Sequence, residues 1–147
     1  MEKHQFHISI NAPREKVWNI LWGDDTYSQW TLAFCENSTA KTDWKTGSKV
    51  LFLDGGNNGL SSIIADQKAN EFISFKHMGK VKSGNEDFDS IPAKEFAGAL
   101  ENYTLKEVNG KTDLIIEMDI SGQYKDYFST TWPKALEKVK ALAEVSS

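Results

Sequence analysis

The sequence predicts an α+β fold in which a curved antiparallel sheet wraps around a long C-terminal helix. Three observations support it: a strand running into a short helix at the start, one long amphipathic helix at the end, and a middle made almost wholly of strands. The 147 residues fit a single domain, residues 1–147, long enough to bury a core without disulfides. A sheet wrapped around a helix tends to enclose a cavity, which we therefore expect.

The opening segment combines a half-buried strand with two short helices. Residues 3–10 alternate between apolar and polar side chains, as a strand with one buried face does. Asn11 is a candidate cap for the next helix, and Pro13 suits its first turn because the ring fixes φ near the helical value. This helix is expected to end at Gly23, and a second short helix is expected over residues 25–30.

The middle of the chain predicts most of a sheet of about six or seven strands. Further strands are expected over residues 48–53, 60–65, 71–78, 99–108 and 112–121. The pair Asn109-Gly110 is typical of a tight hairpin turn. Residues 79–92 are polar and are predicted to form the longest loop, either a lid over the cavity or a surface loop without a role.

The closing segment, residues 124–145, predicts one long helix. Its apolar side chains fall on a single stripe made of Phe128, Trp132, Ala135, Leu136, Val139, Leu142 and Ala143. Pro133 lies inside this segment and should bend the helix, because proline removes a backbone donor and clashes with the preceding turn. The alternative is a helix that begins at Pro133 after a separate turn.

Composition and charge exclude several classes of partner. The chain is 39% hydrophobic and 26% charged, which argues against disorder, and its net charge of -4 disfavours nucleic acid or an anionic membrane as the main partner. No apolar stretch approaches the length of a signal peptide core or a membrane span, so a cytoplasmic protein is expected. Cys35 is the single cysteine, and its apolar neighbours favour a buried, unreactive thiol.

The histidines do not form a metal site in the predicted fold. His4 and His7 lie on one strand but on opposite faces, because strand side chains alternate. His77 is expected at the surface or at the rim of the cavity rather than as a general base. The glycine-rich residues 54–59 lack the lysine and the following helix of a phosphate-binding loop, and indicate a hairpin turn. No metal or other cofactor is expected.

The carboxylates point mostly outward, with one exception. On the last strand, Asp113, Glu117 and Asp119 alternate with apolar residues and should face solvent. On the preceding strand, Glu101 faces inward if Tyr103 does. Glu101 either reaches water at the end of its strand or, with Tyr103, anchors the polar group of a ligand, because an inward carboxylate needs a partner.

Large side chains are the predicted wall of the cavity, since small-molecule sites are mostly apolar with few polar groups. Each ring taken alone fits a core position as well as a ligand contact. The candidate ligand-binding residues are Trp30, Phe34, Trp44, Phe52, Phe75, Glu101, Tyr103, Met118, Phe128 and Trp132.

Together, these elements resemble the helix-grip fold of the START/Bet v 1-like (SRPBCC) superfamily, in the branch of activator of heat-shock protein 90 ATPase homologues. The segments that carry the resemblance are Ile10-Asn11-Ala12-Pro13-Arg14-Glu15-Lys16-Val17-Trp18, Trp44-Lys45-Thr46-Gly47-Ser48 and Tyr127-Phe128-Ser129-Thr130-Thr131-Trp132-Pro133-Lys134-Ala135-Leu136. The superfamily includes lipid and polyketide carriers, aromatase/cyclases, hormone receptors and co-chaperone domains, so the fold alone does not give the function.

Three functions follow as expectations. The leading one is non-catalytic binding of a small hydrophobic or amphipathic molecule, such as a lipid or polyketide-like compound, in the internal cavity. The resemblance implies a second, a co-chaperone-like module whose partner is a chaperone. A cyclase-type enzyme is less favoured, because only Glu101, Tyr103 and His77 are available for acid–base chemistry.

Overall fold

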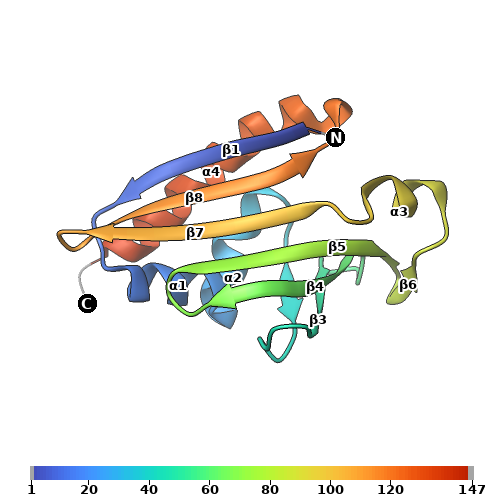
Figure 1. Ribbon diagram of the computed structural model, residues 1–147, viewed down its shortest axis with the longest axis horizontal. Coiled ribbons are helices and arrows are strands. Elements are labelled where there is room, and N and C mark those ends of the chain that lie inside the picture. Colours follow the sequence, from blue (N-terminus) through green and yellow to red (C-terminus); the bar gives the residue numbers. More distant parts are fainter. Residues whose placement is uncertain (1, 146–147) are drawn as a thin grey trace.

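The computed structural model describes residues 2–145 and shows one antiparallel sheet of eight strands with helices packed against it (Figure 1). The strand order is β1-β8-β7-β5-β4-β3-β2, and the short β6 pairs with β5. The strands are β1 (Glu2–Ile10), β2 (Thr39–Lys41), β3 (Lys49–Leu53), β4 (Gly59–Lys68), β5 (Phe72–Lys82), β6 (Asn85–Asp87), β7 (Leu100–Val108) and β8 (Lys111–Ile120). The predicted α+β architecture is confirmed.

Across the described residues, four helices and two short turns complete the fold. The helices are α1 (Arg14–Trp22), α2 (Asp24–Trp30), α3 (Ile91–Phe96) and α4 (Lys125–Glu144), with 3-10 turns η1 (Thr31–Ala33) and η2 (Gly122–Tyr124). In Figure 1, α4 runs behind β1 and β8, while α1 and α2 lie behind the opposite half of the sheet. Within residues 2–145, no helix has the length and apolar character needed to cross a membrane.

Strand β8 shows why the sheet has one buried face. Leu114, Ile116, Met118 and Ile120 are buried, as the alternation predicts. The strand pairs with β1 on one side and with β7 on the other, so these side chains continue rows across all three strands. This inner face packs against α4, where it forms the main hydrophobic core.

Helix α4 is one helix that continues through Pro133. Its buried residues are Thr131, Trp132, Ala135, Leu136, Val139 and Ala143, which lie on the predicted stripe or beside it. The alternative in which a helix begins at Pro133 is therefore wrong. Burial of the stripe against the sheet outweighs the backbone donor that proline lacks.

Helix α1 begins without the predicted asparagine cap. Pro13 occupies the cap position with extended backbone angles, and no side chain of the preceding residues caps the helix. The Arg14 amide instead donates to the Glu107 carboxylate at 2.8 Å, and the Asn11 amide donates to the Glu144 carboxylate at 2.7 Å. The Glu107 carboxylate, distant in sequence, thus binds the first amide of the helix in place of the predicted Asn11 side chain.

Residues 79–92 are not the irregular loop that their polarity predicts. Strand β5 continues to Lys82, a turn at Ser83 and Gly84 with positive φ at both residues leads into β6, and α3 begins at Ile91. A Cβ atom on Gly79 would lie 2.5 Å from the Asp87 carbonyl oxygen, so the close return of this segment requires glycine. The Ser-Gly pair is the local signal that indicates the hairpin.

Candidate functional site

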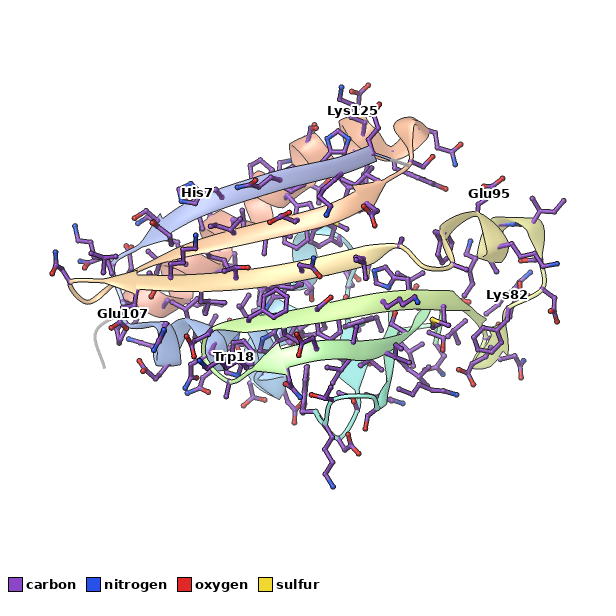
Figure 2. The ribbon with its side chains drawn as sticks, viewed as in Figure 1. His7, Trp18, Lys82, Glu95, Glu107 and Lys125 are labelled. Atoms are coloured by element: carbon purple, nitrogen blue, oxygen red, sulfur yellow. The ribbon has the colours of Figure 1, made fainter. Side chains whose placement is uncertain are left out.

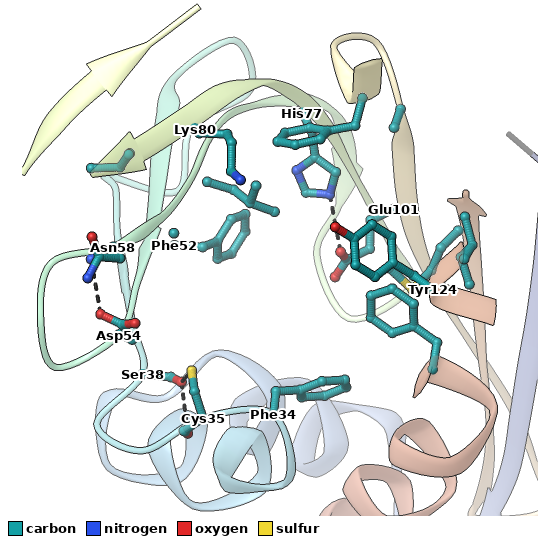
Figure 3. Close-up of a pocket in the computed structure, with 18 of the residues that line it drawn as sticks. Phe34, Cys35, Ser38, Phe52, Asp54, Asn58, His77, Lys80, Glu101 and Tyr124 are labelled. Atoms are coloured by element: carbon teal, nitrogen blue, oxygen red, sulfur yellow. Dashed lines mark hydrogen bonds and ion pairs between the residues drawn. The ribbon is translucent and has the colours of Figure 1, made fainter. Parts of the chain in front are cut away.

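A partly open cavity of about 1150 Å3 lies between the inner face of the sheet and the first half of α4 (Figure 3). Helix α2 and turn η1 supply a further wall, and α3 stands at its outer end. Figure 2 shows Lys82 and Glu95, which line this outer end, at the side of the molecule where β6 and α3 lie. Small-molecule pockets typically measure about 300–1,000 Å3, so the space is sufficient for a drug-sized ligand.

The cavity brings most of the predicted site residues together. Those that line it are Trp30, Phe34, Phe52, Glu101, Tyr103, Met118, Phe128 and Trp132. At its base, the Trp132 ring centroid is 4.9 Å from that of Phe34 and 6.1 Å from that of Trp30. The Trp132 indole donates to the Met118 sulfur at 2.9 Å. These contacts hold the rings in fixed positions around the space.

Two predicted residues, Trp44 and Phe75, lie outside the cavity lining. They pack on Trp22 instead, whose ring centroid is 5.4 Å from that of Trp44 and 5.3 Å from that of Phe75. Phe75 is fully buried, and Trp44 lies on a turn with φ +61° that carries its ring toward the core. Both rings therefore belong to the packed layer beside the cavity.

A chain of hydrogen bonds supplies the polar side of the cavity. His77 on β5 contacts Glu101 on the neighbouring strand β7, with 3.2 Å between Nε2 and Oε1 (Figure 3). The Tyr103 hydroxyl donates to the other Glu101 oxygen. On its far side, His77 Nδ1 lies 2.6 Å from the Ser62 hydroxyl. Glu101 thus faces the cavity with both oxygens partnered, which is how a carboxylate tolerates an apolar setting.

The tyrosines near Glu101 stay neutral. Burial, followed by the charge of Glu101, raises the pKa of Tyr103 well above its ordinary value. Burial and then Glu101 likewise raise the pKa of Tyr27, which lines the cavity from α2. Both phenols are therefore hydrogen-bond donors near one negative charge. Sequence reasoning missed Tyr27, although it precedes the predicted Trp30 by three residues on the same helical face.

His77 is buried rather than exposed, with 6% of its surface accessible, and it lines the cavity. With Ser62 and Glu101 it has the order of a hydrolase triad, in which a base activates a hydroxyl. Ser62, however, is fully buried and is not among the residues that line the cavity. Its hydroxyl cannot reach a substrate, and it serves to hold the imidazole ring in place.

Cys35 is exposed at the rim of the cavity, so the prediction of a buried thiol is wrong. Its sulfur lies 2.8 Å from the Ser38 hydroxyl. The apolar segment around it forms turn η1, which leaves Leu32 59% exposed while Phe34 reaches the cavity. The segment lines the edge of an opening and does not enter the core as a strand would.

His4 and His7 lie on opposite faces of β1, with side-chain exposures of 21% and 52%. Among residues 2–145, no three His, Cys, Asp or Glu side chains gather closely enough to hold a metal ion.

This sheet, this closing helix and the cavity between them define a helix-grip protein of the START/Bet v 1-like (SRPBCC) superfamily. Residues 11–144 match the family described as Activator of Hsp90 ATPase homolog 1-like protein, and the chain belongs to that family. No curated protein matches the sequence.

Solved structures share the fold along nearly the whole chain. The Aha1 dimer from Colwellia psychrerythraea is similar over 99% of this chain and 98% of that chain, with a TM-score of 0.73 and 18% identity. Protein MLL2253 from Mesorhizobium loti is similar over 96% of both chains, with a TM-score of 0.71 and 16% identity. CalU16 from Micromonospora echinospora is similar over 97% of this chain and 74% of that chain, with a TM-score of 0.66 and 17% identity. At these identities the similarities establish the fold alone.

Proposed function

We propose that this protein binds a small amphipathic molecule in the cavity without transforming it. The observation that carries the proposal is a space of about 1150 Å3 whose wall is mostly apolar, with several aromatic rings, and in which hydrogen-bonded neighbours hold the Glu101 carboxylate. Pockets of this composition bind ligands through apolar burial and orient them through a few polar groups. A lipid or polyketide-like compound has both features.

The apolar part of the ligand lies among the rings of Trp30, Phe34, Phe128 and Trp132. These side chains come from α2, the segment after η1 and α4, so they surround the space from two sides. Contacts between the rings, such as that of Phe34 with Phe128 at 6.3 Å between centroids, help to keep them in position. Removal of ligand surface from water supplies the affinity, at about 25 cal/mol per Å2 of apolar surface buried.

The polar part of the ligand lies against Glu101 and Tyr27. A carboxylate accepts hydrogen bonds, so the group placed there is a donor such as a hydroxyl or an amine. Tyr27 has a raised pKa and keeps its proton, and it offers a second contact from the opposite wall. His77 and Tyr103 fix the carboxylate in position before the ligand arrives.

The same hydrogen bonds favour binding over catalysis. His77, Glu101 and Tyr103 all line the cavity, as a cyclase-type enzyme would need. The raised pKa of Tyr103 makes its phenol a poor acid, and Glu101 and His77 already contact each other. The site is therefore built to present a fixed acceptor, and we assign no proton transfer to it.

The tryptophans provide a direct test with built-in controls. Titrating isotope-labelled protein with decanol should shift the indole N–H signals of Trp30 and Trp132, which line the cavity. The signals of Trp18 and Trp22 should move little, because neither residue lines it. Saturable shifts at Trp30 and Trp132 are the expected result. If decanol leaves both indoles unchanged, or shifts all of them equally, the cavity is not the binding site.

Glu101→Gln tests the polar end of the site. The change keeps the shape and removes the charge, so the affinity for decanol should fall about three- to tenfold, the range expected when a charged acceptor becomes neutral. Glu117→Gln, on the solvent side of β8, is the matched control and should leave the affinity unchanged. Equal affinities of wild type and Glu101→Gln, measured by calorimetry, would remove Glu101 from the ligand site.

A second candidate function rests on the family match over residues 11–144. We propose as the alternative that the chain acts on an Hsp90-type chaperone as a co-chaperone, using an exposed surface rather than the cavity. Leu32 is 59% exposed and is not among the residues that line the cavity, whereas Tyr127 is 46% exposed and does line it, so Leu32 is the first residue to test. Adding the protein to a purified chaperone should stimulate ATP hydrolysis, and no stimulation at saturating concentrations would dismiss this function.

A further inference from the structure

A bulge in β5 changes which side chains enter the cavity. His77 points inward, so simple alternation would turn Gly79 inward and Lys80 outward. The register shows otherwise: consecutive residues of β4 pair with His77 and Gly79, which leaves Met78 as an extra residue on β5. Such a bulge reverses the alternation of the strand beyond it and re-aims the following side chains. Lys80 is therefore turned toward the cavity.

The neighbouring strands confirm this direction. Lys80 pairs with Leu60, and Leu60 pairs with Phe52, so the three residues form one row across β5, β4 and β3. All three line the cavity. Figure 3 shows the Lys80 side chain directed into the same space as Phe52, with His77 and Glu101 farther along the wall.

Within the described part of the chain, the Lys80 amine makes no close ion pair, although, after the hydrogen bonds from Ser90, its charge helps to lower the pKa of Asp87, the residue opposite it on β6. Among residues 2–145, no carboxylate oxygen lies within the 4.0 Å ion-pair distance of Nζ, and the amine lies 5.9 Å from the centroid of the Phe96 ring. Nearby acids are engaged with backbone amides: Asp87 accepts from Asp89 and Ser90, and Asp54 accepts from the turn that follows it. The side chain is half-buried, so its charge is only partly solvated.

We propose that Lys80 and Glu101 together select an amphipathic acid that carries a hydroxyl group at its other end. The carboxylate of this ligand pairs with Lys80, and the hydroxyl donates to Glu101. Glu101 lies opposite Phe75, which pairs with Ile64 of β4. Lys80 pairs with Leu60 of the same strand, so four residues of β4, roughly 13 Å along the strand, separate the two polar ends of the ligand. This inference rests on the proposed function and names its ligand class.

The two charges also set the orientation of the ligand. A carboxylate placed at the inner end would meet the negative charge of Glu101, which is unfavourable in an apolar space. The same group at Lys80 forms a charge-assisted hydrogen bond, and these are stronger than neutral ones. A lysine that merely covers Phe96 with its aliphatic part and keeps its amine in water would show no such preference.

Four probes of equal chain length test the inference: ω-hydroxydecanoic acid, decanoic acid, decanol and decylamine. Affinities for the wild-type protein are measured by calorimetry and by the fluorescence of the cavity tryptophans. ω-Hydroxydecanoic acid should bind about tenfold more tightly than decanol, the gain typical of one charge-assisted contact. Decylamine can place its cation only at Glu101, so any gain that it shows over decanol should be lost in Glu101→Gln and should not depend on Lys80.

Lys80→Met removes the charge and keeps most of the aliphatic chain. It should abolish the tenfold advantage of ω-hydroxydecanoic acid and leave decanol binding unchanged, whereas Lys76→Met, on the exposed outer face of β5, should change neither. Thermal unfolding of each variant checks that the fold is intact.

The outcomes separate this inference from the proposed function. If decanol binds at the cavity tryptophans but the hydroxy acid binds no more tightly, or if Lys80→Met keeps its advantage, the selection by Lys80 is overturned and amphipath binding stands. If no probe binds wild-type protein, both are overturned.

Discussion

Replacing Trp132 with alanine is expected to lower the free energy of unfolding by about 3–5 kcal/mol, the range for large-to-small changes of buried aromatic residues. Trp132 is 2% exposed, and its ring is stacked on Phe6 at 6.0 Å and in contact with Phe34 at 4.9 Å. These contacts join α4 to β1 and to the segment after η1. The substitution removes the side chain that joins these three parts of the core. The change in the free energy of unfolding is measured by chemical denaturation.

Two further variants serve as controls for the Trp132→Ala prediction. Trp132→Phe keeps an aromatic ring, so the loss should fall well below that of alanine, to about 1–2 kcal/mol. Trp18→Ala removes a half-buried tryptophan on α1 whose ring contact is with Trp22, at 6.3 Å, and it should also cost less than Trp132→Ala. A loss for Trp132→Ala no larger than that for Trp18→Ala would contradict the central position of Trp132.

The largest elements were predictable because their signals are local. The stripe of α4 and the alternation of β8 each specify a buried face without reference to the rest of the chain. On β7 the alternation left Glu101 either inward with Tyr103 or in water at the strand end, and the structure places both residues on the cavity. Periodicity along one element is therefore sufficient to find residues that face the same side.

Contacts between elements were not predictable in the same way. Glu101 is opposite Phe75 in the pairing of β7 with β5, and this register brings His77 close enough to contact it. Lys80 enters the cavity because Met78 bulges, and a bulge is defined by the partner strand rather than by the sequence around it. Pairing register thus decides which polar groups meet, and a single sequence does not specify it.

The sequence also did not indicate which inward-facing rings are packed within the core and which line the cavity. Phe52 and Phe75 lie on neighbouring parts of the sheet, with centroids 5.0 Å apart, yet Phe52 lines the cavity and Phe75 does not. The difference comes from Trp22, which covers Phe75 from α1. An inward-facing ring becomes core or cavity wall according to what a distant helix places over it, so the sequence predicted the set of rings better than their roles.

Raising the pH above about 10 should destabilise the fold through Tyr103. This residue is 2% exposed, and burial followed by the charge of Glu101 raises its pKa well above the ordinary value of 10.0. In the unfolded chain the phenol ionises near that value, while in the folded protein it stays neutral. The contribution is fully present below pH 10 and is lost as the pH rises toward the folded pKa, at up to about 1.4 kcal/mol per pH unit. Tyr27 acts in the same direction.

Tyr103→Phe should therefore unfold with a shallower loss of stability from neutral pH to about pH 12, measured by denaturation at each pH. Tyr124→Phe, at an exposed tyrosine, should keep the wild-type profile. Parallel profiles for wild type and Tyr103→Phe would show that Tyr103 is not held neutral by its burial beside Glu101, and would contradict the arrangement on which the polar end of the site depends.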